Sequence, residues 1–157
     1  MIQSPQSIFW RDADAAAACA ARIAPRLAPG DTVLLDGQVG AGKTHFARSL
    51  IQSILDVPED VPSPTFTLVQ TYDTARGALW HTDLYRVTSD QEIDELGLIE
   101  AFDDAICLVE WPDRLGSVTP ADALHLQIAV DDMARQVTLH WTDAKWSARL
   151  TGVLADE

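Results

Sequence analysis

The sequence contains few basic residues. Its 24 aspartates and glutamates face only 11 lysines and arginines, which gives a net charge of −13, and just two residues, Lys43 and Lys145, are lysines. A protein with this balance is repelled by the phosphate backbone of nucleic acids. We therefore do not expect this chain to bind RNA or DNA directly.

Cysteines and long apolar runs are scarce as well. The two cysteines are Cys19 and Cys107, and no apolar run approaches the ~20 residues that a membrane-spanning helix needs. The N-terminal segment lacks the charged and then apolar layout of a secretion signal. We therefore expect a cytoplasmic protein that does not enter the membrane, with both cysteines reduced and packed rather than joined in a disulfide or a metal site.

The acidic residues are concentrated in one part of the chain. Between Asp83 and Asp113 there are ten carboxylates and a single basic residue, Arg86. The simpler interpretation is a solvated face, and the alternative is a docking surface for a basic partner.

Length and hydrophobic pattern predict an α/β fold in one domain. The 157 residues contain no internal repeat and no linker, so we expect a single domain over residues 1–157. Two apolar runs, "TVLLDG" and "AICLVEW", are typical of buried central strands. Alternating patterns predict further strands at 65–72, 78–87, 124–130 and 136–141. Helical spacing predicts helices at 12–28, 43–55, 91–102 and 145–154.

Local signals refine this pattern. Asp12 is a candidate N-cap of the first helix, and Pro25 should kink or shorten its last turns. The segment "SDQE", beginning at Ser89, is a capping box that opens a short acidic helix. The alternation in 65–72 places Phe66 and Tyr72 on the same face of a strand, together with Leu68 and Gln70, and this strand should form a hairpin with the next one.

The stretch "GQVGAGKT" at residues 37–44 matches the P-loop motif G-x-x-x-x-G-K-[ST] in full. Its glycines let successive backbone N–H groups point at a phosphate, and the helix that follows turns its positive end toward the same anion. Lys43 should reach the β- and γ-phosphates, and the Thr44 hydroxyl should bind Mg²⁺. We therefore expect the chain to bind a nucleoside triphosphate through Gly37, Gln38, Val39, Gly40, Ala41, Gly42, Lys43 and Thr44.

Two classes of P-loop protein do not fit the rest of the sequence. A GTPase needs an N-K-x-D motif to recognise guanine, and the only lysine outside the P-loop lies in "DAKW". A transporter ATPase needs a longer chain with a serine- and glycine-rich signature, which is not present. ATP is therefore the expected nucleotide. A small-molecule kinase and a small ATPase that acts on a partner remain.

Two carboxylates follow predicted strands and are candidates for the second half of the site. Magnesium in P-loop proteins is held by a carboxylate at the end of a neighbouring buried strand. We assign Glu110, which ends "AICLVE", to the metal together with Thr44. Asp83, in "WHTDLYR", would orient or deprotonate the attacking group. The alternative for either residue is a surface or capping acid.

The segment "SPTFT" supplies a third element. In other P-loop proteins a threonine from such a loop senses the γ-phosphate and Mg²⁺, and Thr65 and Thr67 are candidates for this role here, although strand initiation is an equal alternative. Arg86 and Arg114 are candidate charge stabilisers or partners in salt bridges. His81 is interpreted as a structural residue, with a ligand or switch role as the alternative.

Taken in order, the segments "GQVGAGKTHFAR", "SPTFTLV", "HTDLYR", "DELGL" and "CLVEWPDRLG" resemble the TsaE or YjeE family of small bacterial ATPases, over roughly residues 8–140. This family is required for making threonylcarbamoyladenosine in tRNA. The resemblance implies a single P-loop domain with a central mixed β-sheet flanked by helices. It also implies a magnesium-dependent ATPase that works with the TsaD–TsaB pair and resets this synthase between rounds, so that tRNA is involved only through the complex.

Matching motifs carry the roles of individual residues across. The resemblance implies that Thr44 and Glu110 bind Mg²⁺, that Asp83 is the catalytic carboxylate, and that Thr65 and Thr67 form a switch-like loop. It places Trp111 beside the metal site and Arg135 near the nucleotide. Here the glycine that usually precedes this arginine is Ala134, and the usual G-D/N-L-G start of the P-loop is "GQVG".

The leading prediction is therefore a partner-dependent ATPase. The alternatives are a small-molecule kinase, against which the basic residues are scattered rather than gathered in a lid, and a binding module in which ATP is structural. Because no arginine finger is obvious in the chain, we expect slow hydrolysis by the isolated protein.

Overall fold

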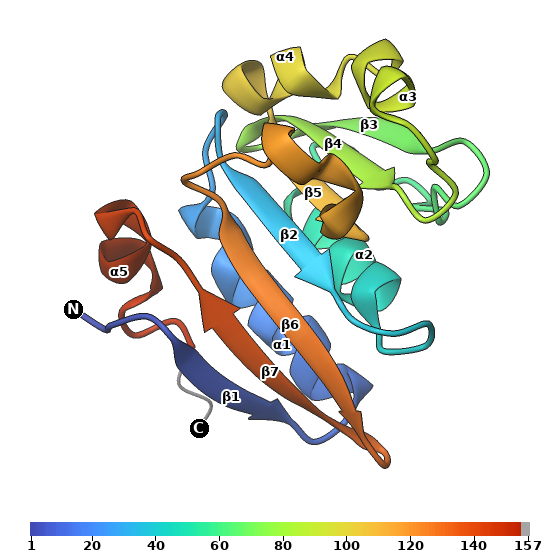
Figure 1. The fold of residues 1–157 in the computed structure, drawn as a ribbon. Helices are drawn as coiled ribbons and strands as arrows, with labels where there is room; N and C mark the ends of the chain where they lie inside the picture. Colours follow the sequence, from blue (N-terminus) through green and yellow to red (C-terminus); the bar gives the residue numbers. More distant parts are fainter. Residues whose placement is uncertain (155–157) are drawn as a thin grey trace.

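The computed structural model describes residues 1–154, which contain one seven-stranded sheet in the order β1-β7-β6-β2-β5-β4-β3 (Figure 1). The four central strands, β6, β2, β5 and β4, run parallel, and the pairs β1–β7, β7–β6 and β4–β3 are antiparallel. The expected α/β fold with a mixed sheet is confirmed. The strands are β1 (Gln6–Trp10), β2 (Thr32–Asp36), β3 (Val69–Thr74), β4 (Gly77–Asp83), β5 (Ile106–Glu110), β6 (Leu124–Asp131) and β7 (Ala134–His140).

Helices cover both faces of the sheet. The α-helices are α1 (Ala13–Ile23), α2 (Lys43–Ile54), α3 (Asp90–Glu95), α4 (Leu98–Asp104) and α5 (Ala144–Leu150), and the 3₁₀ segments are η1 (Ala24–Arg26) and η2 (Pro112–Val118). Helices α1 and α2 lie behind the sheet in Figure 1, whereas α3, α4 and η2 lie over its β4–β5 half.

Strand β2 shows why the core has two parts. Side chains of a strand alternate between faces, so the buried residues Val33 and Leu35 join the cluster that contains α1 and α2, whereas Leu34 joins the cluster that contains α3 and α4. A strand that is buried on both faces reads as a continuous apolar run. This explains why "TVLLDG" and "AICLVEW" were recognisable as central strands.

The segment 65–72 differs from the prediction. Strand β3 begins only at Val69, because Leu68 has a positive φ of 69° and its N–H donates to the carbonyl of Pro64, which closes a turn. Phe66 is 81% exposed instead of sharing a buried face with Tyr72. The predicted hairpin is confirmed, because β3 and β4 pair in antiparallel register.

Other boundaries differ for identifiable reasons. Gly97, with φ of 78°, divides the predicted helix 91–102 into α3 and α4. The first helix changes to a 3₁₀ turn at Pro25, and the last one ends at Leu150. Two predicted caps are confirmed: Asp12 accepts the N–H of Ala15, and Ser89 accepts that of Glu92. Strand β1 and segment η2 are not predicted by any pattern in the sequence.

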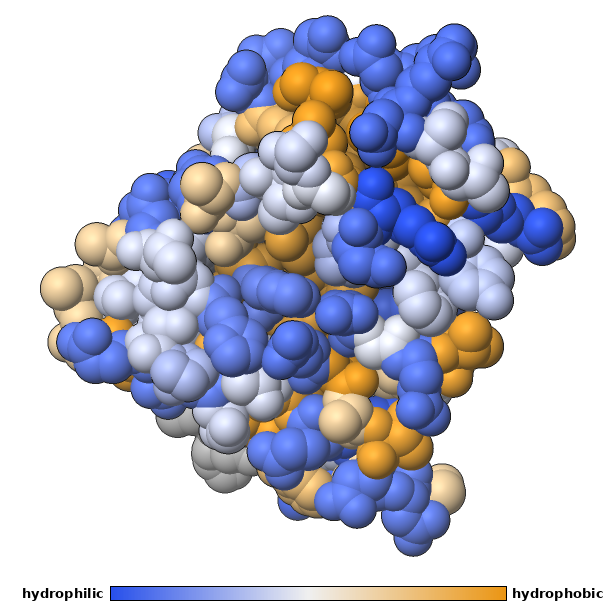
Figure 2. All heavy atoms as spheres, in the orientation of Figure 1, coloured by the Kyte–Doolittle hydropathy of each residue, from blue (hydrophilic) through white to orange (hydrophobic). Residues whose placement is uncertain are grey.

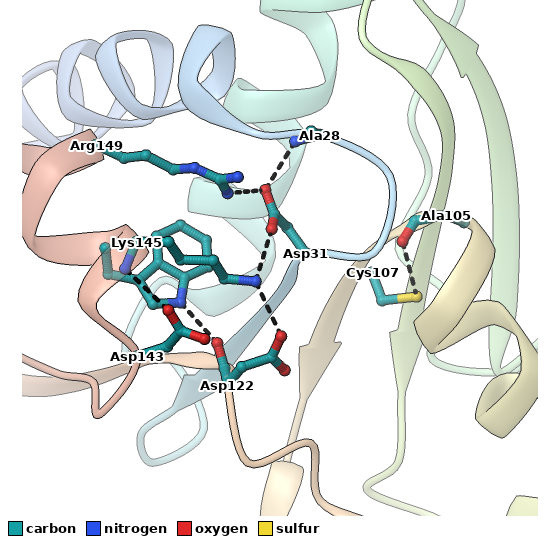
Figure 3. A network of polar contacts seen from close by, with 9 residues as sticks. Ala28, Asp31, Ala105, Cys107, Asp122, Asp143, Lys145 and Arg149 are labelled. Carbon is teal, nitrogen blue, oxygen red and sulfur yellow. Dashed lines mark hydrogen bonds and ion pairs between the residues drawn. The ribbon is translucent and has the colours of Figure 1, made fainter.

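A polar network joins α5 to the start of β2 (Figure 3). The buried carboxylate of Asp31 accepts a hydrogen bond from the N–H of Ala28 at 2.8 Å and forms ion pairs with Lys145, at 3.0 Å, and with Arg149. Lys145 also contacts Asp122, at 2.9 Å, in the segment that leads into β6. The network therefore fixes three segments that are distant in sequence, at the end of the sheet away from the P-loop.

The acidic stretch is mostly exposed. Hydrophilic residues cover the top of the molecule over α3 and α4 (Figure 2), and the exposed carboxylates there are Asp90, Asp94, Glu95, Glu100, Asp103 and Asp104. Within residues 1–154, no helix is both long and apolar enough to cross a lipid bilayer.

Candidate active site

A pocket of about 390 Å³ lies where the parallel strands β2, β4 and β5 end. Asp83 is the last residue of β4 and Glu110 the last of β5, and the two are paired in the register of these strands. Because parallel strands end at the same edge of a sheet, both carboxylates face the P-loop that follows β2. The pocket lining also includes Lys43, Thr44 and Thr65.

The backbone of the P-loop depends on glycine at its two ends. A Cβ atom at Gly37 would lie 2.6 Å from the carbonyl oxygen of Ile128 in β6, so no larger residue fits. Gly42 has φ of 107° and immediately precedes α2, which begins at Lys43. Only glycine adopts such a conformation at little cost. The loop therefore passes close to the sheet and leads directly into the helix.

Lys43 is held by the loop that it belongs to. Its Nζ donates to the carbonyl oxygens of Gly37 and Gln38 and lies 4.2 Å from the centre of the Trp111 ring. Burial lowers the pKa of Lys43, and the charges of Glu110, Asp83 and Asp36 oppose this effect. The ammonium group is therefore already positioned at the pocket, and the carbonyl oxygens that hold it are neutral.

Thr44 and Glu110 are suited to hold a magnesium ion. The Thr44 hydroxyl donates to Oε1 of Glu110 at 2.7 Å, so a hydroxyl oxygen and a carboxylate oxygen converge beside the P-loop. Mg²⁺ prefers such oxygen ligands and takes its remaining ligands from phosphates and water. The residues that are present therefore fit the ion that the sequence predicts.

Asp83 lies in an environment that disfavours its charge. Burial raises its pKa, and so does the negative charge of Glu110, whereas the N–H of Tyr85, 2.9 Å from Oδ1, lowers it. Thr65 donates to Oδ2 at 3.4 Å. A carboxylate with a raised pKa is a better proton acceptor when deprotonated than one in water, which suits a general base.

Trp111 has a backbone conformation that is unusual for a tryptophan. Its φ of 60° and ψ of 55° lie in the left-handed region, immediately after Glu110. This turn brings the indole against Lys43 and against Tyr85, with ring centres 4.8 Å apart in the second pair. Backbone strain of this kind is concentrated at functional sites.

Not every predicted residue reaches the pocket. Thr67 accepts a hydrogen bond from Gln70 outside it, and Gln38 lines a neighbouring hollow on the β6–β7 side. Arg135 lies against the P-loop, where it donates to the carbonyls of Gly40 and Ala41. It is therefore placed to support the loop.

The two candidate arginines have separate locations. Arg86 lines the pocket, and its guanidinium stacks on the ring of Phe66, with Cζ 4.8 Å from the ring centre. Arg114 lies outside the pocket and donates to the carbonyl of Tyr85 at 3.4 Å. The structure therefore distinguishes two arginines that the sequence alone does not separate.

The sequence does not single out Tyr85 as a site residue, and it favours a structural role for His81. Tyr85 lines the pocket and packs on Trp111, and His81 contacts the carboxylate of Glu110. The available signal was spacing, because His81 and Asp83 are two apart on one strand and must share a face.

A G-x-x-x-x-G-K-T loop between a buried parallel strand and a helix, with carboxylates at the ends of two adjacent strands, defines a P-loop protein of the α/β class. Comparison with known proteins identifies the family within this class. Residues 10–137 match the profile of the family described as threonylcarbamoyl adenosine biosynthesis protein TsaE. The chain belongs to the TsaE family.

Individual relatives agree with this assignment. The chain is 39% identical over 110 residues to the tRNA threonylcarbamoyladenosine biosynthesis protein TsaE of Rickettsia felis, and the match covers 70% of this chain and 64% of that protein, slightly less than two thirds of its length. It is 37% identical over 108 residues to TsaE of Haemophilus influenzae, covering 68% of each. The crystal structure of Bacillus subtilis YdiB has the same fold, with a TM-score of 0.76 over 98% of this chain and 96% of that one at 24% identity.

Proposed function

We propose that this chain is a magnesium-dependent ATPase of the threonylcarbamoyladenosine modification of tRNA. It acts on the TsaD–TsaB synthase pair and supports repeated turnover, and it contacts tRNA only through that complex. The proposal includes the cytoplasmic location and the single domain over residues 1–157 that the sequence led us to expect.

One observation carries the ATPase part of the proposal. Lys43, Thr44, Asp83 and Glu110, from three separate segments of the chain, line the same pocket. Its size suits the phosphates of a nucleotide, and its lining combines a cation, a hydroxyl and two carboxylates. Membership of the TsaE family supports the pathway, because the relatives are named for it.

The side chains divide the chemistry among them. Lys43 and the N–H groups of the P-loop bind phosphate oxygens and stabilise the charge that develops in the transition state. Thr44 and Glu110 would hold Mg²⁺, which neutralises phosphate charge when bound. Asp83 orients the attacking water and accepts its proton at a carboxylate oxygen.

Arg86 is proposed as a cation supplied by the chain itself. Within residues 1–154 its one recorded partner is the Phe66 ring, so no carboxylate neutralises it. Phe66 is carried by the "SPTFT" loop, and a movement of that loop would therefore shift the guanidinium relative to the pocket. This arrangement couples the loop to the site.

The experiment that tests the proposal is phosphate release from Mg-ATP, measured for the chain alone and with the TsaD–TsaB pair. We expect slow release by the chain alone and strong stimulation by the pair, and neither with Asp83→Ala. Hydrolysis that the pair leaves unchanged would contradict the proposed partners. A phosphorylated small molecule in place of free phosphate would indicate a kinase instead.

A further inference from the structure

His81 lies behind the proposed metal site, and the function proposed above gives it no role. It is fully buried in β4, on the face of the sheet that carries Leu79 and the neighbouring Leu108 of β5. An imidazole in such apolar surroundings lowers stability unless it is hydrogen-bonded. Its partner should therefore indicate why a histidine occupies this position.

The partner of His81 is the carboxylate of Glu110. The Nε2 atom lies 2.7 Å from Oε2 of Glu110, whereas Nδ1 has no hydrogen-bond partner among residues 1–154. A neutral ring with its proton on Nε2 donates to Glu110 and leaves only a lone pair on Nδ1. In this tautomer the one N–H of the buried ring has an acceptor.

The two oxygens of Glu110 consequently have different neighbours. Oε2 is held by His81 on the buried side, and Oε1 accepts the hydrogen bond from Thr44 at the pocket. The side chain of Glu110 is only 2% exposed, so water does not compete for Oε2. A carboxylate held at one oxygen cannot rotate freely and presents the other oxygen in a fixed direction.

We propose that His81 is a positioning residue that holds Glu110 so that its Oε1 faces the metal beside Thr44. The proposal rests on the function proposed above, which assigns Mg²⁺ to these two residues. Hydrogen bonds to metal ligands from such outer residues are typically worth about 10- to 100-fold in metal affinity. His81 would then act on the metal without touching it.

A pair of substitutions separates positioning from packing. His81→Gln places an amide nitrogen at about the reach of Nε2, whereas His81→Asn places one at the reach of Nδ1, which has no partner to meet. We expect His81→Asn to weaken Mn²⁺ binding to the ADP-loaded chain by about 10- to 100-fold, and His81→Gln to restore most of it. Mn²⁺ is the probe, and free Mn²⁺ is measured by electron paramagnetic resonance. ADP affinity in EDTA should stay within about 2-fold for both variants.

Each outcome bears on a definite claim. Parental Mn²⁺ affinity in His81→Asn would overturn the inference, as would an equal loss in both variants or a matching loss of ADP affinity in EDTA, since these indicate packing alone. A parent chain that binds ADP but no Mn²⁺ would overturn the proposed metal site as well, which distinguishes the two failures.

A measurement on the unsubstituted chain covers the case in which a variant does not fold. Nitrogen-15 NMR of the histidine rings should show His81 with its proton on Nε2, hydrogen-bonded in the parent and altered in Glu110→Gln. A ring that carries its proton on Nδ1 alone would overturn the inference without any substitution of His81.

Discussion

Asp83 shows how a single residue can serve the site at the expense of the fold. Its carboxylate is buried, and both burial and the nearby charge of Glu110 raise its pKa. A folded-state pKa above the unfolded value means that the folded protein holds the proton more tightly. Below the unfolded pKa the carboxyl is protonated in both states, and Asp83 does not destabilise the fold. As pH rises through the folded pKa the carboxyl ionises in its buried position, and the free energy of unfolding falls.

Asp83→Asn should accordingly raise the melting temperature at neutral pH while removing activity. Asparagine keeps the shape and can still accept the N–H of Tyr85, but it brings no charge and accepts no proton. We expect ATP turnover to fall on the order of 10²-fold or more. Calorimetry and phosphate release measure the two effects. A variant that is less stable than the parent at neutral pH, or equally active, would contradict this account of Asp83.

Arg86 leads to a second prediction at the residue scale. Arg86→Ala should lower kcat on the order of 10²-fold, because it removes a cation from the pocket, and should change nucleotide affinity much less. The kcat of Arg86→Lys should lie between those of the parent and of Arg86→Ala, since lysine keeps the charge and loses the planar guanidinium. Arg114→Ala is the matched control outside the pocket. Equal losses for Arg86→Ala and Arg114→Ala would assign both arginines to the surface.

Among the elements, α5 depends on one buried carboxylate. Burial opposes the ionisation of Asp31, but the hydrogen bonds and charges of Arg149, Ala28 and Lys145 outweigh it and lower its pKa. The stability that this provides is present above the unfolded pKa and is lost as pH falls through the folded one. The polar network that joins α5, the start of β2 and the segment before β6 therefore stabilises the fold at neutral pH and weakens in acid.

Asp31→Asn should reduce the free energy of unfolding by about 2 to 3 kcal/mol at neutral pH, because two basic groups lose a charged hydrogen-bond acceptor. The difference from the parent should begin to shrink below about pH 4, where the carboxylate of the unfolded chain takes up a proton. It should disappear at still lower pH, because the pKa of Asp31 is lowered in the folded protein. Urea denaturation at several pH values measures both. Asp103→Asn, on the exposed side of α4, should change stability by less than about 0.5 kcal/mol at each pH.

The elements that could be predicted are those with strong local patterns. Strands β2 and β5 are buried on both faces and read as apolar runs, and the caps at Asp12 and Ser89 are short-range hydrogen bonds. Residues 65–68 were wrongly predicted as part of a strand, because their polar and apolar residues alternate as in a strand. In the structure the positive φ of Leu68 turns the chain there. Strand β1 was missed because its place at the edge depends on pairing with β7, far along the chain.

The residues of the candidate site also differ in whether a local sequence pattern predicts their place. The P-loop and the strand-end positions of Asp83 and Glu110 follow from sequence order, so the residues of the pocket were largely predictable. The contact between His81 and Glu110 depends on the register of β4 against β5, and the place of Arg135 depends on the β6–β7 hairpin. The register is not encoded in a local motif, and only the family resemblance, not the hairpin pattern, led us to expect Arg135 near the nucleotide.

At the scale of the whole molecule, charge is the dominant property. The net charge of −13 is accompanied by exposed carboxylates on α3 and α4 that have no ion pair within residues 1–154. Such a surface repels nucleic acids and attracts basic surfaces, with a strength that salt reduces.

The chain alone should therefore not bind tRNA at about 150 mM salt, a condition at which exposed charges act over roughly 8 Å. Fluorescence anisotropy with labelled tRNA tests this, with the TsaD–TsaB pair as the comparison sample. Binding by the isolated chain at this salt concentration would show that a local feature overcomes the net charge, and would contradict a role in which tRNA is reached only through partners.

The position of Gly37 against Ile128 has a consequence for protein synthesis. The ribosome completes the P-loop motif early, but the strands on both sides of β2 and Arg135, which holds Gly40 and Ala41, are translated much later. A nascent chain that has emerged only as far as α2 carries the whole motif but lacks the two neighbouring strands and Arg135. The ATP that we propose as the ligand would therefore assist folding only after the last hairpin has left the exit tunnel.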